Sequence, residues 1–368
     1  MFSRESIRYL RQAIKDRRVT RGPLDIQILP TTRCNAACTF CPDQAVPEEI
    51  KAEFDPRWLA LPEEIPLGLL DRLADELCRL GGLRRIHITG GEPLLYRHII
   101  PLIFTTRRDF PEVEITLVTN GILLKNFAHP LARIGLDRLS VSLNAGTSET
   151  YQKLNPAASK TTFPEIIKGI RAVADQKRDA GTDKPYISVT SVLTRENTDE
   201  LDKMFRLCLD AGAGGLTFIP LMEFRRGDLN CNQDHIPDTH GFERFLSEIE
   251  RLAPEASKAG FYIGYSGDPA FRGVLRHHDI YSRIPCYAGY TFAMIWPNGD
   301  VRPCCNCEYV LGNLKESGFS TIWRSERAQA MRQRMLSIIE QGPPALCDCA
   351  ECGYLYENNN FHENLQKT

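Results

Sequence analysis

The stretch LDIQILPTTRCNAACTFCP, residues 24–42, contains the features that decide the fold of this chain. Its first six residues are rich in strand-forming side chains and predict a strand. Cys34, Cys38 and Cys41 follow on a single loop. A cubane iron–sulfur cluster bound by three thiolates leaves one iron with an open position for a ligand. A structural zinc site needs four closed ligands, and this loop lacks the fourth.

Downstream of this loop, short β-rich runs alternate with helix-patterned stretches such as 67–81 and 163–176. Six β–α units joined by right-handed crossovers predict an α/β fold, a partial (β/α)6 barrel that resembles a TIM barrel. Functional loops of such a barrel lie at the carboxyl ends of the strands. The strands are predicted at 24–29, 85–89, 113–119, 138–143, 186–193 and 215–221.

The cysteine spacing Cys-x3-Cys-x2-Cys, with Phe40 just before the third cysteine, resembles the signature of the radical S-adenosylmethionine (radical SAM) superfamily. The resemblance implies a [4Fe–4S] cluster on Cys34, Cys38 and Cys41, whose open iron binds the methionine amino and carboxylate groups of S-adenosylmethionine. One electron then cleaves the sulfur–C5′ bond, and the 5′-deoxyadenosyl radical removes a hydrogen atom from a substrate. It also implies that Phe40 belongs to the cofactor site.

Two more strand ends carry motifs of this family. Gly90-Gly91-Glu92-Pro93 ends the second predicted strand, where two glycines allow close backbone approach and Glu92 offers an acceptor for an amine. It resembles the family's Gly-Gly-Glu-Pro motif, which implies contacts from Gly90, Gly91 and Glu92 to the methionyl amine. Thr119-Asn120-Gly121 ends the third strand and is expected to be scaffolding.

Polar residues after the fourth and fifth strands complete the predicted cofactor site. Ser142 and Asn144 share one face by the strand's period of two, and both side chains hydrogen-bond hydroxyl groups such as those of ribose. Family members often have aspartate at the position of Asn144. Arg195 follows the fifth strand and is either a partner of the methionyl carboxylate or a surface arginine.

The C-terminal half predicts a second module. A helix near Asp238–Leu252 is followed by a hairpin whose turn is Asn298-Gly299, and by a helix at about Thr321–Glu340. The second domain is expected to start between about Phe261 and Cys286. The predicted divisions are an N-terminal helix 1–23, a barrel 24–235, a connecting segment 236–275, an auxiliary module 276–352 and a polar tail 353–368.

Seven cysteines crowd the C-terminal part: Cys286, Cys304, Cys305, Cys307, Cys347, Cys349 and Cys352. Twelve residues separate Cys286 from Gly299 and four more precede Cys304. This pattern resembles the auxiliary-cluster module called SPASM, or twitch in its shorter form, which implies a second [4Fe–4S] cluster on Cys286, Cys304, Cys349 and Cys352. Cys307 is then a ligand, a hydrogen-atom donor or merely buried, and Cys305 and Cys347 are surplus. Taken alone, the group also fits a zinc knuckle.

Composition narrows the remaining choices. The chain has 45 basic and 47 acidic residues, a net charge of −2, so neither nucleic acid nor a membrane surface is an expected partner. The N-terminus lacks the apolar core of a signal peptide, which predicts a cytoplasmic protein and cysteines that are thiols or metal ligands. Of the scattered cysteines, Cys78 and Cys208 lie in helix patterns and are expected in the core. A basic helix around Ile7, Leu10 and Ile14 is expected to cap the fold.

The substrate is less determined than the family. Only 33 residues precede Cys34, which favours a small-molecule substrate, or a separately encoded peptide-binding partner, over a leader peptide bound by a domain of the same chain. The single auxiliary cluster resembles that of 2-deoxy-scyllo-inosamine dehydrogenase, which implies oxidation of a sugar or aminocyclitol alcohol with the auxiliary cluster as electron acceptor. An electron donor such as flavodoxin or ferredoxin is expected. The alternatives are an epimerase or peptide-modifying enzyme with a cysteine hydrogen donor, and a non-catalytic zinc scaffold.

Two loops are further candidates for the substrate cleft. The insert between Pro42 and Pro66 is a predicted lid. Arg225 and Arg226 follow the sixth strand and are either an anion clamp or part of a solvated loop.

Overall fold

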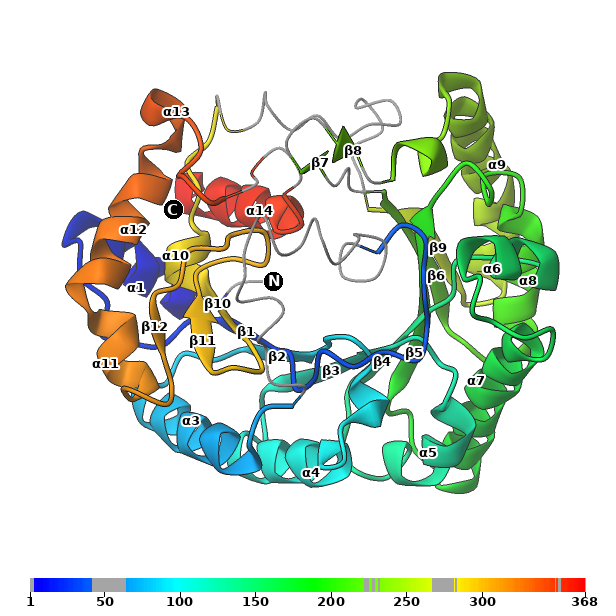
Figure 1. Ribbon diagram of the computed structural model, residues 1–368, viewed down its shortest axis with the longest axis horizontal. Coiled ribbons are helices and arrows are strands. Elements are labelled where there is room, and N and C mark those ends of the chain that lie inside the picture. Colours follow the sequence, from blue (N-terminus) through cyan, green and yellow to red (C-terminus); the bar gives the residue numbers. More distant parts are fainter. Residues whose placement is uncertain are drawn as a thin grey trace.

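The computed structural model describes residues 3–41, 64–221, 225–226, 229–230, 232–266, 281, 283–347, 349 and 352–367. A parallel sheet curls around an interior, and helices cover its outer side (Figure 1). The six predicted strands are confirmed, each within one residue of its predicted bounds. They are β1 (Asp25–Ile28), β2 (Arg85–Ile88), β3 (Glu114–Thr119), β4 (Arg138–Ser142), β5 (Tyr186–Leu193) and β6 (Gly215–Pro220).

Amphipathic helices connect these strands and bury one face each against the sheet. In α3 the buried leucines recur at helical spacing, including Leu69, Leu73, Leu77 and Leu80. The connecting helices are α3 (Leu67–Leu80), η2 (Pro93–Leu95), α4 (Ile99–Asp109), α5 (Leu124–Leu131), α6 (Ser148–Leu154), α7 (Thr162–Asp179) and α8 (Leu201–Asp210). Alternating β and α units thus give the predicted partial barrel.

The two faces of the barrel sheet differ in chemistry. In β4, Leu139 and Val141 are fully buried in the main hydrophobic core, whereas Ser142 is half-buried. Ser140 and Thr190 lie on the same face as Ser142, and their hydroxyl oxygens are 2.8 Å apart across β4 and β5. Because side chains alternate along a strand, the inner face of the curled sheet is polar. It suits a polar ligand better than an apolar one.

The C-terminal hairpin continues the barrel sheet, which the sequence did not predict. Strand β10 (Phe292–Ile295) pairs in parallel with β1, so Asp25 lies opposite Phe292. The predicted turn at Asn298-Gly299 is confirmed and leads into β11 (Asp300–Arg302) and β12 (Gly312–Asn313). At the other edge, β9 (Tyr262–Tyr265) pairs with β6. The sheet order is β12-β11-β10-β1-β2-β3-β4-β5-β6-β9.

The predicted helix at Thr321–Glu340 is wrong as a single element. Ser325 has extended backbone, and its hydroxyl accepts a hydrogen bond from the Ala328 N–H, which ends one helix and caps the next. The segment forms α11 (Phe319–Arg324), α12 (Glu326–Leu336) and α13 (Ile338–Gln341). The helix near 238–252 is confirmed and extends further, as α9 (Thr239–Lys258).

The predicted polar tail is also wrong. It forms helix α14 (Leu355–Gln366), which packs beside α1 (Arg4–Lys15) and buries Asn358 and Phe361. The Asn358 amide accepts from the Tyr287 N–H at 2.7 Å and donates to the Pro285 carbonyl at 2.9 Å. One buried amide, which both accepts and donates a hydrogen bond, therefore fixes α14 to the segment just before α10 (Ala288–Thr291).

Other predictions have mixed outcomes. The N-terminal helix is confirmed, with Ile7 and Leu10 buried, and Cys208 is fully buried in α8. Cys78 is exposed on the outer side of α3, so its assignment to the core was wrong. Most of the predicted lid, 42–63, and the side chains of Arg225 and Arg226 in the pair β7 (Arg225–Arg226) and β8 (Leu229–Asn230) lie outside the described residues.

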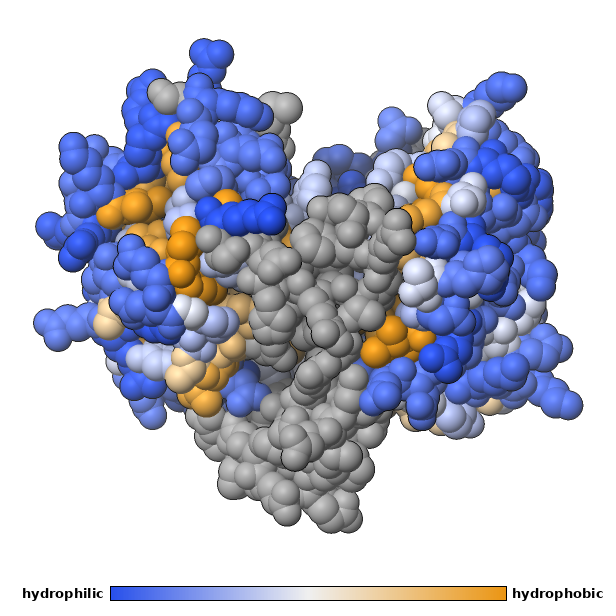
Figure 2. All heavy atoms as spheres, turned by 90° about the horizontal axis from the view of Figure 1, so that it is seen from above, coloured by the Kyte–Doolittle hydropathy of each residue, from blue (hydrophilic) through white to orange (hydrophobic). Residues whose placement is uncertain are grey.

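The outer flanks of the molecule are mostly hydrophilic in Figure 2. Within the part of the chain that the structure describes, each helix is too short or too polar to cross a membrane.

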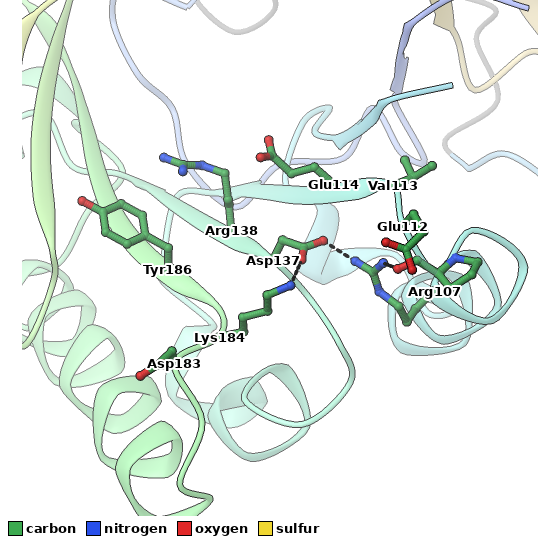
Figure 3. Close-up of a pocket in the computed structure, with 10 residues that line it drawn as sticks. Arg107, Glu112, Val113, Glu114, Asp137, Arg138, Asp183, Lys184 and Tyr186 are labelled. Carbon is green, nitrogen blue, oxygen red and sulfur yellow. Dashed lines mark hydrogen bonds and ion pairs between the residues drawn. The ribbon is translucent and has the colours of Figure 1, made fainter. Parts of the chain in front are cut away.

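At the amino ends of β3–β5, opposite the end that carries the cysteine loop, a cavity of about 360 Å³ lies over Asp137 (Figure 3). The Asp137 carboxylate pairs with Arg107 and with Lys184 at 2.5 Å, and accepts from the Ile115 N–H at 2.8 Å. Burial alone raises the pKa of Asp137, but these hydrogen bonds and cations outweigh it, so the pKa lies below its usual range. The network ties the start of β4 to α4, to β3 and to the segment just before β5.

Candidate active site

The loop of Cys34, Cys38 and Cys41 leaves β1 at the carboxyl end of the sheet and is held by the end of α6. The Ala37 N–H donates to the Asn155 side-chain oxygen at 2.8 Å, and the Thr39 N–H donates to the Leu154 carbonyl at 3.0 Å. All three thiols are half-buried. The loop is therefore a fixed platform at the end of the barrel, as predicted.

The three thiols lie close enough to influence one another. Burial raises the pKa of Cys38 to about 12, and the neighbouring Cys41 and Cys34 sulfurs add to the rise. Burial also raises the pKa of Cys34. Without a metal, the negative charges of neighbouring thiolates repel one another, which favours the protonated thiols. Bound iron would favour the thiolates, because its positive charge offsets this repulsion.

A four-iron cluster spreads its ligands more widely than one ion does. Accordingly, among the described residues no three Cys, His, Asp or Glu side chains form a ready-made site for a single metal ion. The donor set on this loop, three sulfurs without a fourth, fits a cluster with an open iron.

The two glycines of the Gly90-Gly91 pair have a role that the sequence did not indicate. A Cβ on Gly90 would lie 2.6 Å from the Thr31 carbonyl oxygen, and one on Gly91 would lie 2.6 Å from the Thr32 oxygen and collide with that of Arg33. The Gly91 N–H donates to the Thr31 carbonyl at 3.0 Å. The glycines thus permit the end of β2 to bond directly to the cysteine loop; a contact with the methionyl amine stays a prediction.

Glu92 is fully buried and already accepts three hydrogen bonds. They come from the Leu94 N–H at 2.9 Å, the Thr119 hydroxyl at 2.7 Å and the Asn120 N–H at 2.7 Å. Burial raises the pKa of Glu92, while these three donors oppose the rise. Glu92 therefore braces the end of β2 against the end of β3, and its predicted contact with the cofactor is untested.

Asn120, for which the sequence predicts only a scaffolding role, contacts the cysteine loop. Its side-chain nitrogen lies 3.8 Å from the Cys34 sulfur, as a donor, and 2.8 Å from the Asn35 side-chain oxygen. Its backbone N–H donates a hydrogen bond to the Glu92 carboxylate. The position of Asn120 directly after β3 could have indicated this contact, because the carboxyl ends of neighbouring parallel strands meet at one edge of the sheet.

The remaining predicted cofactor contacts are placed near this edge but stay predictions. Asn144 is buried, and its side-chain oxygen accepts from the Val192 N–H at 2.7 Å, which extends the β4–β5 pairing beyond Ser142. Arg195 donates from Nε to the Ile236 carbonyl at 3.2 Å. Phe40 packs in a small apolar cluster with Leu154 and Leu221.

The four predicted auxiliary ligands converge beside the C-terminal hairpin. Cys286, Cys304 and Cys352 are buried, and Cys349 is half-buried. Burial raises the pKa of Cys286, and the nearby sulfurs of Cys304 and Cys349 raise it further. Burial raises that of Cys352 as well, with added effects of Cys304 and Cys286. The Tyr281 hydroxyl lies 2.8 Å from the Cys352 sulfur. These four cysteines therefore lie together, and their role as ligands that close a second cluster stays a prediction.

The surplus cysteines separate into two kinds. Cys307 and Cys347 form a disulfide and lie opposite each other in a β-bridge. In this state Cys307 has no S–H to donate as a hydrogen atom and no thiolate for a cluster. Cys305 is free and half-buried, next to Cys304, which is predicted to be a ligand.

A barrel with three thiols at one end, joined to a hairpin region with four more thiols, is an arrangement typical of iron–sulfur enzymes. Comparison with known families agrees. The model of the radical SAM superfamily matches residues 28–208, and that of an iron–sulfur cluster-binding domain, SPASM, matches residues 286–353.

Curated relatives extend the match. The chain is 30% identical over 286 residues to a probable GTP 3′,8-cyclase of Metallosphaera sedula, covering 78% of this chain and 76% of that one. It is 27% identical over 225 residues to a probable GTP 3′,8-cyclase of Saccharolobus solfataricus, covering 61% of this chain and 65% of that one. This chain therefore spans just under two thirds of the latter. The chain belongs to the radical SAM superfamily, and it is an enzyme that uses S-adenosylmethionine and two [4Fe–4S] clusters.

Solved structures show the same fold. Streptococcus suis SuiB bound to S-adenosylmethionine has a TM-score of 0.65 at 17% identity, covering 95% of this chain and 75% of that one. The enzyme anSMEcpe with bound AdoMet has a TM-score of 0.61 at 14% identity, covering 94% and 100%. The specific resemblance to 2-deoxy-scyllo-inosamine dehydrogenase finds no support, because these curated relatives are named as cyclases.

Proposed function

We propose that this enzyme oxidises a small polar molecule, with the auxiliary cluster as the one-electron acceptor. The observation that supports the proposal is the set of four thiols around Cys304, three of them buried. A cluster closed by four protein ligands has no open iron for a substrate, so electron transfer is its simplest role. The polar inner face of the barrel, with Ser140, Ser142 and Thr190, suits a substrate that carries hydroxyl or amino groups.

When bound, S-adenosylmethionine and the two clusters supply the radical that removes hydrogen and the site that receives the electron. The chain's own residues hold the geometry. Gly90 and Gly91 let β2 bond to the cysteine loop, and Glu92 ties the ends of β2 and β3 together. In total the substrate would lose one hydrogen atom, which ends up in 5′-deoxyadenosine, one electron, which passes to the auxiliary cluster, and one proton, which goes to solvent. The separate electron that cleaves S-adenosylmethionine would come from the external electron donor.

A second candidate is cyclisation of a purine nucleotide. It is supported by the relative from Metallosphaera sedula, named a probable GTP 3′,8-cyclase, at 30% identity over 76% of its length. The two candidates differ in their products. The oxidation yields a product lighter by two hydrogen atoms, whereas a cyclase of this kind consumes GTP itself.

The first experiment tests the auxiliary cluster. Anaerobically reconstituted enzyme is expected to hold about eight irons and eight sulfides per chain, and Cys352→Ala about four. The variant is expected to cleave S-adenosylmethionine once reduced but to form no product. Cys305→Ser, which changes the neighbouring free thiol, is the matched control and retains both clusters. A Cys352→Ala enzyme with its full iron content would contradict the ligand assignment.

The second experiment identifies the reaction. The reduced enzyme is incubated with S-adenosylmethionine and either GTP or a fractionated extract of polar metabolites, and products are followed by mass spectrometry. A metabolite that loses two hydrogen atoms, one molecule per 5′-deoxyadenosine, supports oxidation. Consumption of one GTP per 5′-deoxyadenosine would instead support cyclisation and would contradict the proposed oxidation. Zinc in place of iron would refute both.

A further inference from the structure

A cavity of about 460 Å³ lies between the turn that follows α1 and the helices α11 and α12. None of its lining residues belongs to either cysteine site. Four arginines and one carboxylate line it, so its charge is strongly positive. The lining residues are Arg17, Arg18, Val19, Thr20, Arg324, Glu326, Gln329 and Arg332.

Arg332 is a buried cation without a carboxylate partner among the described residues. Its exposed fraction is 1%. Nε donates to the Gly289 carbonyl at 2.8 Å and Nη2 to the Trp323 carbonyl at 2.7 Å, while Nη1 is buried without a hydrogen-bond partner in the described part of the chain. Burial lowers the pKa of Arg332 to about 10, so the side chain is still charged at neutral pH. A buried, incompletely bonded charge is costly unless a counter-ion is near.

Other cations converge on the same place. The Arg332 guanidinium lies over the ring of Tyr290, at 5.6 Å from its centre. Burial raises the pKa of Tyr290, and the charges of Arg332 and Arg17, which both line the cavity, oppose that rise. Arg17 has a φ of 53°, a conformation that a side-chain-bearing residue adopts at a cost of about 1 kcal/mol. Arg324 reaches the Thr20 carbonyl at 2.6 Å from Nη2.

The start of α12 adds to this field. The helix begins at Glu326, on the wall of the cavity, and Ser325 caps it by accepting from the Ala328 N–H at 3.1 Å. The positive end of the helix dipole therefore lies at the cavity. Glu326 offsets part of the charge but leaves four guanidinium groups against one carboxylate.

We infer that this cavity binds a phosphoryl group, either free phosphate or pyrophosphate or the phosphate of a small metabolite. Arginine forks match the oxygens of phosphate, and Arg17, Arg18 and Arg324 are exposed and able to turn toward it. Arg332 contributes its charge from beneath. A bound phosphoryl group would join the α1–β1 connection to the auxiliary module, which the Trp323 indole already does by donating to the Arg21 carbonyl at 3.0 Å. The inference does not depend on the proposed function.

Titration calorimetry of the full chain with both clusters tests this inference, with pyrophosphate, phosphate and ADP as probes at about 0.1 M salt. The double variant Arg17→Gln/Arg324→Gln is expected to weaken binding by about tenfold or more, since each lost arginine contact to phosphate is charge-assisted. Arg4→Gln/Arg8→Gln is the matched control, because it removes the same charge from the exposed face of α1 outside the cavity. Arg332 is left intact because its replacement also removes two structural hydrogen bonds.

Each outcome has a defined meaning. Pyrophosphate that binds the wild type and the control alike, and raises their melting temperature but not that of the cavity variant, supports the site. If ADP binds and pyrophosphate does not, the ligand is a phosphorylated metabolite. If ADP and pyrophosphate bind equally well, the cavity recognises the phosphoryl group alone. The absence of saturable binding, or equal loss in both double variants, would overturn the inference.

Discussion

Replacing Gly91 by alanine should separate the cysteine loop from the barrel. The new Cβ would lie 2.6 Å from the Thr32 carbonyl oxygen and nearer still to that of Arg33, both in the backbone of the loop. Backbone cannot rotate away as a flexible side chain does, so the loop must shift by roughly 1 Å. That shift breaks the hydrogen bond from the Gly91 N–H to the Thr31 carbonyl, at 3.0 Å, and the one from the Glu92 N–H to Arg33, at 2.7 Å.

The size of the effect follows from these contacts. Two backbone hydrogen bonds at about 1 kcal/mol each, together with overpacking, lower the free energy of unfolding by about 2–5 kcal/mol. The first cluster is more sensitive, since it needs three sulfurs in place. Iron is expected to fall from about eight to about four per chain, because the auxiliary site is untouched. Formation of 5′-deoxyadenosine is expected to stop.

The matched control is Gly68→Ala. Gly68 lies on α3 with nothing within 4 Å of an added Cβ, so alanine there should stabilise the helix by up to about 1 kcal/mol. Iron content, S-adenosylmethionine cleavage and urea unfolding are measured for both variants, with far-UV circular dichroism to confirm that each is folded. A Gly91→Ala enzyme with full iron and wild-type cleavage would refute the argument that the glycine exists for this close approach.

Three further predictions concern other sites. Asn120→Ala removes the donor 3.8 Å from the Cys34 sulfur, so a redox titration followed by EPR should show a lower reduction potential for the first cluster, and an unchanged potential would contradict that role. Asp137→Asn removes a carboxylate whose pKa lies below its usual range despite its burial, so the variant should lose about 2–4 kcal/mol at pH 7 in urea unfolding. The loss should begin to shrink below the unfolded-state pKa of about 4, where Asp137 in the unfolded chain takes up a proton, and should vanish only below its lower folded-state pKa; a loss independent of pH would disprove the linkage. In the native, folded enzyme Cys78 should react with maleimide while Cys208 should not. Labelling of both cysteines would show that Cys208 is accessible and that α8 does not pack as the structure has it.

The parts of the fold that repeat were predictable from sequence. The strands of the barrel have strong local patterns, and β5 (Tyr186–Leu193) matches its predicted bounds fully. Pairings between distant segments could not be predicted from the sequence, because a local pattern does not indicate which other segment an element pairs with. The parallel contact of β10 with β1, and the burial of Asn358 in a segment that looks like a polar tail, both belong to this kind.

The same distinction holds for the site. Cys34, Cys38 and Cys41 were identifiable because their spacing is chemically specific. The role of Gly91 was only half visible, since the sequence predicts that the glycine permits close approach to a ligand, whereas the structure shows a close approach to the backbone of the cysteine loop. The sequence predicts only a scaffolding role for Asn120 at the end of its strand, because the contact of its side chain with the Cys34 sulfur joins segments that are distant in sequence.

The pairing of β10 with β1 has a consequence for how the chain is made. Strand β1 lies near the N-terminus, yet its outer neighbour, residues 292–295, leaves the ribosome long afterwards. During synthesis the β1 edge is therefore open, and an unpaired strand edge is a template for association with other chains. Closing that edge forms a contact between residues very distant in sequence, which is slow. The loop that collects the first cluster follows β1, so productive loading with iron is expected to be most efficient after translation ends, when the hairpin has covered that edge.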